Sequence, residues 1–435
     1  MTKRMLLAIL LLIVFALPAG CQKQGGEPTQ PTAPAPTILP THTPEPSPTP
    51  TPDPVGEALA GMTVEQKAAQ LLVAGIEGTE PGEDAVQAVQ GYQVGGVILF
   101  GRNVESAEQL AALTNGLKEL NGDYTPLFLC VDQEGGRVDR MPPEVTDLPS
   151  ALDFGSIADP EARMDACFTL GQTLAAQCAA FGFNMDFAPS LDIWSNPENT
   201  VIGDRAFGTD AATVTGAANE TALGILSGGV IPVAKHFPGH GDTAVDSHYG
   251  LPVVDKSLEE LEELELRPFR QAIDTTCVYG TYGGDTSIPA IMVAHILLSQ
   301  IDPDNPASLS PEVVTGLLRE EMGYEGVVCT DDLTMGAISN TYGMGEAAVL
   351  AVEAGCDLLL VCHGADNLAE AHAALVEAVE SGRISMERLD ESVYRVLSLK
   401  AVYGLSNAPV EAPDIEALND RIAALERSIE ADTSQ

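Results

Sequence analysis

The sequence has few basic and few aromatic residues for its length. Its 435 residues include 21 Lys and Arg against 63 Asp and Glu, which gives a formal net charge of −42 at pH 7. A surface of that sign repels phosphate backbones and anionic head groups, so the composition argues against nucleic acid partners and against electrostatic membrane binding. Aromatic residues make up only 5% of the chain and hydrophobic residues 45%. A large core is therefore possible, but it must be mostly aliphatic.

The sequence also lacks a Cys-x-x-Cys pair among its eight cysteines. Apart from Cys21, most of the cysteines lie inside apolar runs, and their count of seven excludes complete intramolecular pairing. We therefore expect buried free thiols rather than a disulfide framework. These seven cysteines are Cys130, Cys167, Cys178, Cys277, Cys329, Cys356 and Cys362.

The N-terminus has the charge pattern of an export signal. Lys3 and Arg4 precede an apolar run, Met5–Leu17, which is too short to span a membrane stably. Ala19-Gly20-Cys21 follows, and it resembles the lipobox of bacterial lipoproteins, in which the cysteine is acylated. Pro18 departs from that pattern, because leucine usually fills its place. We expect a lipoprotein-type signal over residues 1–21 and an extracytoplasmic, lipid-anchored protein, with an ordinary cleavable signal as the alternative.

A Pro/Thr-rich, low-complexity segment follows over residues 22–55. Such a segment has no apolar period and is extended and semi-rigid, at about 3.1 Å per residue, so it could reach on the order of 100 Å. A lipid anchor followed by a spacer suits an enzyme that works within a cell wall. In this interpretation the membrane is contacted only through the anchor.

Residues 56–405 alternate short β-branched runs with amphipathic stretches. This repetition predicts a single (β/α)₈ TIM-type barrel of class α/β, with a doubly wound open sheet as the competing fold. Helices are expected between the strands, for example at Ser106–Leu120 and Leu258–Ile273, and one more helix is expected after the eighth unit, at Met386–Val402. Residues 406–435 are expected to form a charged C-terminal tail. The predicted strands are Gln70–Gly75, Val94–Phe100, Pro126–Asp132, Asn184–Ile193, Ile231–His236, Ala290–Ile296, Gly326–Asp331 and Cys356–Cys362.

Polar residues gather where the predicted strands end. In barrels of this kind the active site lies at the carboxyl ends of the strands, so these residues are candidates for one site. They are Asp132 and Arg140 after the third strand, Asp192 and Arg205 after the fourth, Lys235 and His236 on the fifth, His295 on the sixth, and Asp331 and Asp332 on the seventh.

Three of the seven histidines lie between residues 236 and 248. One interpretation is a metal site formed by His236, His240 and His248, but Pro238-Gly239 disfavours the helix on which a His-x₃-His spacing would bind metal. The other is acid–base chemistry, with Asp246 orienting His248 and a carboxylate nucleophile at Asp331 or Asp332. Such a pair would suit a retaining glycosidase, although an ordinary polar loop remains an alternative at this point.

Several longer motifs resemble family 3 glycoside hydrolases, and more narrowly their β-N-acetylglucosaminidase (β-hexosaminidase) branch. The main one is KHFPGHGDT at Lys235–Thr243, followed by Asp246-Ser247-His248. The others, in the same order as in that family, are DQEGGRV at Asp132–Val138, NMDFAP at Asn184–Pro189, VIGDRAFG at Val201–Gly208 and TDDLTM at Thr330–Met335.

The resemblance implies a retaining hydrolase of terminal β-linked N-acetylglucosamine that needs no cofactor or metal. By motif position, Asp331 would be the nucleophile and His248 the acid/base, with Asp246 as its partner. The sugar would be bound by Asp132, Arg140, Arg205, Lys235 and His236. Cell-wall fragments are the expected substrate. The alternatives are an N-acetylglucosaminide phosphorylase, a β-glucosidase-like enzyme and a non-catalytic sugar-binding lipoprotein. Residues 275–289 resemble an insertion before the sixth strand.

Overall fold

The computed structural model describes residues 53–243, 246–275 and 288–433. Cys21, the signal segment, most of the Pro/Thr-rich segment, Cys277 and most of the expected insertion lie outside the described residues. All six other cysteines are buried and free, as predicted. Within the described ranges no helix combines the length and the apolar character that a membrane crossing requires.

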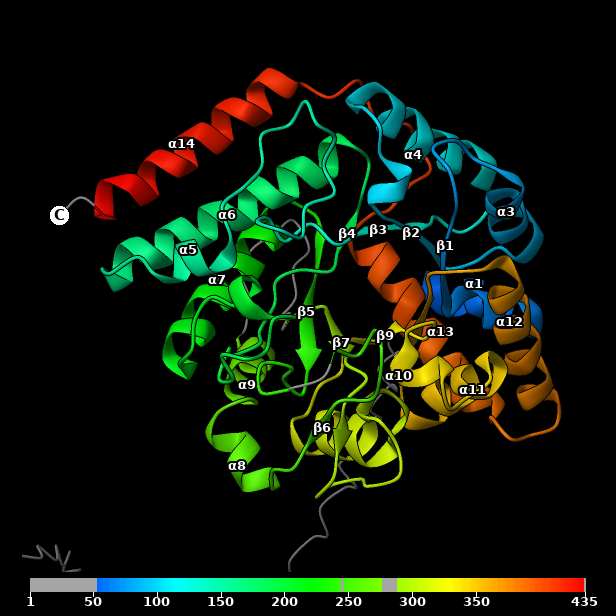
Figure 1. The fold of residues 1–435 in the computed structure, drawn as a ribbon. Coiled ribbons are helices and arrows are strands. Elements are labelled where there is room, and N and C mark those ends of the chain that lie inside the picture. Colours follow the sequence, from blue (N-terminus) through cyan, green and yellow to red (C-terminus); the bar gives the residue numbers. More distant parts are fainter. Residues whose placement is uncertain (1–52, 244–245, 276–287, 434–435) are drawn as a thin grey trace, which may run out of the picture. The chain divides into compact units, whose positions relative to one another are not determined.

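Eight parallel strands close into a barrel in the order β1-β10-β9-β7-β5-β4-β3-β2 (Figure 1). The barrel is closed because β1 pairs with both β10 and β2, so the predicted (β/α)₈ fold is confirmed and the open sheet is excluded. Each strand overlaps a predicted one. Their bounds are β1 Leu72–Gly75, β2 Gly96–Leu99, β3 Phe128–Val131, β4 Met185–Asp186, β5 Ile231–Phe237, β7 Ala290–Val293, β9 Val327–Asp332 and β10 Leu358–Val361. A separate two-stranded sheet pairs β6 (Val253–Val254) with β8 (Leu297–Leu298).

Helices surround the barrel, and several begin at side-chain caps, such as Thr63 before α2 and Ser257 before α8. The helices are α1 Pro54–Ala60, α2 Val64–Gln70, α3 Glu83–Val86, α4 Ala107–Asn121, α5 Ala151–Gly155, α6 Pro160–Ala180, α7 Ala211–Ser227, α8 Leu258–Glu263, α9 Arg267–Asp274, α10 Gly336–Ser339, α11 Met344–Ala354, α12 Ala365–Glu380, α13 Met386–Val402 and α14 Ile415–Thr433, with the π-helical segments η1 Gln87–Tyr92 and η5 Glu312–Glu321 and the 3₁₀ turns η2 Gly101–Asn103, η3 Gly203–Arg205 and η4 Ala307–Leu309.

Two predicted elements differ from the observed ones, and proline is involved in both. The helix expected over Leu258–Ile273 is divided into α8 and α9. Pro268 lacks the N–H that a continuous helix needs, and its ring would meet the carbonyl of Leu264. The strand expected over Asn184–Ile193 is only two residues long, and it ends before Pro189, which cannot donate to a ladder.

The barrel interior is filled by side chains, as the aliphatic composition predicts. Val73, Phe128 and Val233 belong to this inner cluster, together with Val396 and Leu399 of α13. Lys400 of α13 donates hydrogen bonds to Gln70 Oε1 and to the carbonyl of Gly95, both at 2.8 Å, just before β1 and β2 begin. Helix α13 therefore covers the amino-terminal end of the barrel, which leaves the carboxyl-terminal end for a site.

The C-terminal segment forms a helix that packs on the domain. Figure 1 shows α14 running along α6, and its Leu418, Ile422 and Leu425 side chains are buried. The Asn419 side chain binds the segment that follows β3, since it accepts from the Thr146 N–H (2.8 Å) and donates to the Glu144 carbonyl (3.0 Å). The segment expected as a charged tail is therefore part of the folded unit.

We expect Ile422→Ala to lower the free energy of unfolding by about 2–4 kcal/mol, because Ile422 is fully buried and its loss leaves a cavity between α14 and α6. Urea unfolding followed by circular dichroism measures this. The exposed neighbour Arg421→Ala is the matched control and should change stability by less than about 0.5 kcal/mol. Equal midpoints for wild type and Ile422→Ala would contradict the observed packing.

Candidate active site

A pocket opens at the carboxyl ends of the strands and brings together most of the residues that the sequence singled out. Of these residues, some lie on β5 and β9, and the others follow β3, lie in η3 or lie in the segment after β5. The predicted site residues that line the pocket are Asp132, Arg140, Arg205, Lys235, His236, His248, Asp331 and Asp332. Asp246 contacts His248 rather than lining the pocket itself.

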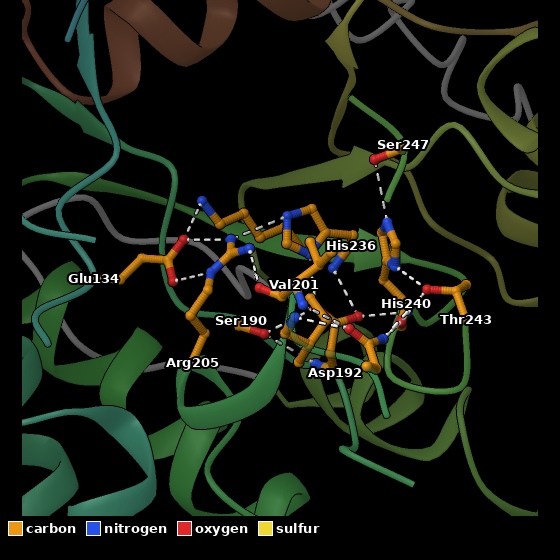
Figure 2. A network of polar contacts seen from close by, with 12 residues as sticks. Glu134, Ser190, Asp192, Val201, Arg205, His236, His240, Thr243 and Ser247 are labelled. Carbon is orange, nitrogen blue, oxygen red and sulfur yellow. Dashed lines mark hydrogen bonds and ion pairs between the residues drawn. The ribbon is translucent and has the colours of Figure 1, made fainter. Parts of the chain in front are cut away.

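A buried network of charges forms one side of the pocket. The Lys235 ammonium contacts Asp132 Oδ1 (2.6 Å) and Glu134 Oε1 (2.7 Å). Figure 2 shows Arg205 forming two parallel hydrogen bonds with the Glu134 carboxylate, at 2.7 and 2.9 Å. Burial would lower the pKa of Lys235, but Asp132 and Glu134 outweigh it and raise that pKa. The charges are thus compensated within the network, which fixes these side chains in place for hydrogen bonding to a ligand.

Sequence reasoning missed Glu134, although it lies within the quoted DQEGGRV motif. Two cations as buried as Lys235 and Arg205 require an acidic partner. That requirement was the signal that could have indicated Glu134. Arg137 of the same motif was also missed. It donates to the carbonyls of Thr200 (2.8 Å) and Val201 (2.7 Å), and so it holds the segment that leads to Arg205.

His236 is oriented from behind by Asp192. Asp192, which the sequence placed near the mouth, is fully buried, and its Oδ2 lies 2.6 Å from His236 Nδ1 (Figure 2). Arg205 Nη2 lies 3.4 Å from His236 Nε2. Because a guanidinium only donates, Nε2 must accept in this contact, and Nδ1 then carries the proton donated to Asp192.

The histidine cluster does not have the arrangement of a metal site. Both ring nitrogens of His240 contact hydroxyl groups, with Thr243 Oγ1 2.7 Å from Nδ1 and Ser247 Oγ 3.3 Å from Nε2 (Figure 2). The pKa of His240 is lowered to about 4, mainly by burial and secondly by the nearby His236. Among the described residues no group of three or more His, Cys, Asp or Glu side chains is placed to hold a metal ion.

Asp246 and His248 form the local pair that their spacing suggests. Asp246 Oδ1 lies 2.8 Å from His248 Nδ1 and accepts the His248 N–H at 2.9 Å. Partial burial would raise the pKa of Asp246, but these two hydrogen bonds hold it below its ordinary value. The His248 side chain is 65% exposed and lines the pocket, and Nδ1 is the ring nitrogen that contacts Asp246, which leaves Nε2 for a ligand.

The segment that carries this pair is bonded to the segment that follows β9. The Ala337 N–H donates to the Ser247 carbonyl (2.9 Å), and the Gly336 N–H donates to the His248 carbonyl (3.2 Å). Residues 246–248 are therefore held beside the strand that ends in Asp331 and Asp332.

The contacts of Asp331 and Asp332 distinguish two carboxylates that the sequence alone could not. Asp332 uses both oxygens internally, since Oδ1 accepts the N–H groups of Thr334 and Cys362 and Oδ2 accepts the Thr334 hydroxyl. Asp331 accepts one hydrogen bond from the described part of the chain, from the Asp332 N–H (2.8 Å). Of these two carboxylates, that of Asp331 is therefore the one available to a ligand in the pocket.

The surroundings of Asp331 favour its ionised form. Burial would raise the pKa of its carboxyl, but the imidazoles of His295 and His236 and the Asp332 N–H hold that pKa below its ordinary value. His295, which the sequence placed at the mouth, is fully buried and donates through Nε2 to the Asp332 carbonyl (2.9 Å). It therefore supports the end of β9 from behind.

We expect Glu134→Gln to destabilise the protein by about 3–5 kcal/mol, because a neutral amide leaves buried positive charge on Arg205 uncompensated. Urea unfolding at pH 7 measures this. The exposed Glu325→Gln, which makes no ion pair in the described part of the chain, is the control and should behave as wild type. A stable Glu134→Gln protein would contradict the role given to Glu134.

Stability should also fall in acid. Burial would raise the pKa values of Glu134 and Asp192. Arg205 nevertheless holds the pKa of Glu134 below the ordinary 4.5, and His236 holds that of Asp192 below the ordinary 3.8. A carboxyl with a depressed pKa stabilises the fold above its ordinary pKa, and this contribution is lost as the pH falls below that value. Asp186 acts in the opposite direction, because burial raises its pKa.

Glu134→Gln should therefore flatten the fall of the urea midpoint between about pH 5 and about pH 3. Urea titrations of both proteins across that range measure the two slopes. Identical slopes would contradict the depressed pKa of Glu134.

Known proteins resemble this chain in sequence and in fold. The model of the glycosyl hydrolase family 3 N-terminal domain matches residues 63–399. A β-hexosaminidase of Nitrosomonas eutropha is 35% identical over 331 residues, which is 75% of this chain and 91% of that protein. A β-hexosaminidase of Methylococcus capsulatus is 40% identical over 66% of this chain and 80% of that protein. The structure of a family 3 β-N-acetylglucosaminidase from Paenibacillus superposes with a TM-score of 0.77 and 41% identity, covering 85% of this chain and 69% of that chain.

The barrel, its pocket of carboxylates and cations, and these similarities define a glycoside hydrolase. The chain belongs to glycosyl hydrolase family 3, with its family domain at residues 63–399.

Proposed function

We propose that the protein is a retaining β-N-acetylhexosaminidase that releases terminal β-linked N-acetylglucosamine. The observation that carries this proposal is the available Asp331 carboxylate, in one pocket with a histidine that is paired to Asp246 on a neighbouring segment. The β-hexosaminidase relatives support the choice of sugar.

In the proposed reaction Asp331 attacks the anomeric carbon, and a carbon–oxygen bond to the enzyme forms as the glycosidic bond breaks. His248 gives its proton to the departing oxygen, and Asp246 stabilises the protonated ring before that transfer. Water then attacks the glycosyl-enzyme, His248 takes the proton, and Asp331 is released. Asp132, Arg140, Arg205, Lys235 and His236 hold the hydroxyl and N-acetyl groups of the sugar by charge-assisted hydrogen bonds.

Hydrolysis of 4-nitrophenyl N-acetyl-β-glucosaminide and of the corresponding β-glucoside tests the proposal. We expect cleavage of the first, little cleavage of the second, and a β-configured first product by proton NMR. An α-configured first product would contradict the retaining mechanism. A product that becomes the sugar 1-phosphate when phosphate is added would instead indicate a phosphorylase, and sugar binding without turnover would indicate a binding protein.

We further propose that the natural substrates are cell-wall fragments and that the protein is held outside the cytoplasm by a lipid on Cys21. Support comes from the order of Lys3 and Arg4, the apolar run Met5–Leu17 and the Pro/Thr-rich segment over residues 22–55. Labelled palmitate should enter the wild type and be absent from Cys21→Ser. Equal labelling of the two proteins would contradict the anchor.

A further inference from the structure

Two stacked rings form part of the pocket wall. No step of the proposed reaction uses them. Phe100 follows β2 and His363 follows β10, and both line the pocket. Their ring centroids are 5.7 Å apart and their planes differ by 23°. The His363 side chain is 54% exposed, which places this ring at the opening of the pocket rather than in its depth.

Arg102 holds this wall in place. Its guanidinium lies over the Phe100 ring, 4.7 Å from the centroid. It also donates to the Ile76 carbonyl (3.2 Å) and to the Cys362 carbonyl (2.9 Å), the residue before His363. The segments after β1, β2 and β10, which are neighbours in the barrel, are thus tied together, and the stacked rings have a fixed position before any ligand arrives.

The position of the stack differs from that of the groups assigned to the terminal sugar. Those groups come from β5, η3 and the segment after β3, and they are charged or hydrogen-bonding. The Phe100–His363 wall comes from the segments after β2 and β10 and presents ring surface near solvent. A leaving group departs through the opening of the pocket, and the apolar C–H face of a pyranose can pack on an aromatic ring that is already fixed.

We propose that the Phe100–His363 stack binds the leaving-group sugar, the unit released when the terminal sugar is cleaved, and so selects saccharide leaving groups over small ones. This inference rests on the proposed hydrolase function. His363 is then a specificity-determining residue that contacts the leaving group and takes no part in bond cleavage.

His363→Ala tests the proposal with two substrates that share the terminal sugar. N,N′-diacetylchitobiose carries a sugar as leaving group, whereas N-acetyl-β-glucosaminyl fluoride carries a single atom. We expect kcat/KM for the disaccharide to fall roughly ten-fold and kcat/KM for the fluoride to stay within about two-fold of wild type. Inhibition by free N-acetylglucosamine, which reports on the terminal sugar alone, should not change. His363→Phe keeps a ring and should retain most of the activity on the disaccharide.

His372→Ala is the matched control. The His372 ring also contacts an aromatic ring, that of Tyr92 at 4.8 Å, but neither residue lines the pocket. It should cleave both substrates as the wild type does. Equal losses on both substrates with His363→Ala, weaker inhibition by N-acetylglucosamine, or no change on either substrate would overturn the proposal. A wild-type protein that cleaves neither substrate would overturn the proposed function, and this inference with it.

Discussion

Asp331→Ala is expected to lower kcat on 4-nitrophenyl N-acetyl-β-glucosaminide by roughly 10⁴-fold or more, because the proposed reaction forms its glycosyl-enzyme on this carboxylate. The carboxylate lies at the end of β9 in the pocket and accepts a single hydrogen bond within the described residues. Its depressed pKa keeps it ionised at neutral pH. Steady-state kinetics at pH 7 measure the loss, and full activity in this variant would reject the assignment.

Added azide shows whether the lost group is the nucleophile. In Asp331→Ala a small anion can occupy the space of the carboxylate, attack the anomeric carbon directly and give an α-configured glycosyl azide. Rescue with a β-configured product would assign Asp331 to the acid/base step instead. Asp332→Asn provides the comparison, because its carboxylate bonds Thr334 and Cys362. It should lower the free energy of unfolding while keeping most of kcat.

His248→Ala should have the second largest effect, and its size should depend on the leaving group. General acid catalysis contributes about 10²–10⁴-fold, so kcat/KM for a disaccharide should fall within that range. A 2,4-dinitrophenyl glycoside needs little proton donation to depart, and its cleavage should be reduced far less in the glycosylation step. Equal losses on the two substrates would contradict the role of His248 as the acid.

Asp246→Asn tests how much the contact between Asp246 and His248 contributes to catalysis beyond the imidazole alone. The amide keeps the size of the side chain but cannot stabilise a protonated ring as a carboxylate does, so an effect in the same direction and smaller than that of His248→Ala is expected. Wild-type kinetics in Asp246→Asn would show that the 2.8 Å contact is not used in catalysis.

The barrel could be predicted from the sequence because its signal is local. Each buried parallel strand is a short apolar run, and each run is followed by an amphipathic stretch. An apolar run does not fix the extent of a strand where proline intervenes, as at Pro189, because proline cannot donate to the ladder. The division at Pro268 could have been predicted, since the residue that breaks the helix is visible in the sequence.

The site was predictable only in part, because its decisive contacts join distant segments. Asp331 and Asp332 are adjacent and chemically identical, and only the side-chain contacts with Thr334 and Cys362 distinguish them. Glu134 has its partner Arg205 71 residues further along the chain.

The same limit applies outside the charge network. The packing of His363 on Phe100 joins the segments after β10 and β2 and has no local signal. The apolar face of α14 is visible in the sequence, but its partner α6 is not.

The most direct test of the account is to trap the covalent intermediate. A 5-fluoro N-acetyl-β-glucosaminyl fluoride slows both chemical steps, but its reactive fluoride leaving group lets the glycosyl-enzyme accumulate, and mass spectrometry of the peptides then locates the added sugar. The account predicts one sugar per protein, attached to Asp331 and absent in Asp331→Ala. A sugar on Asp332 or Glu134, or turnover with inversion and no trapped species, would contradict it.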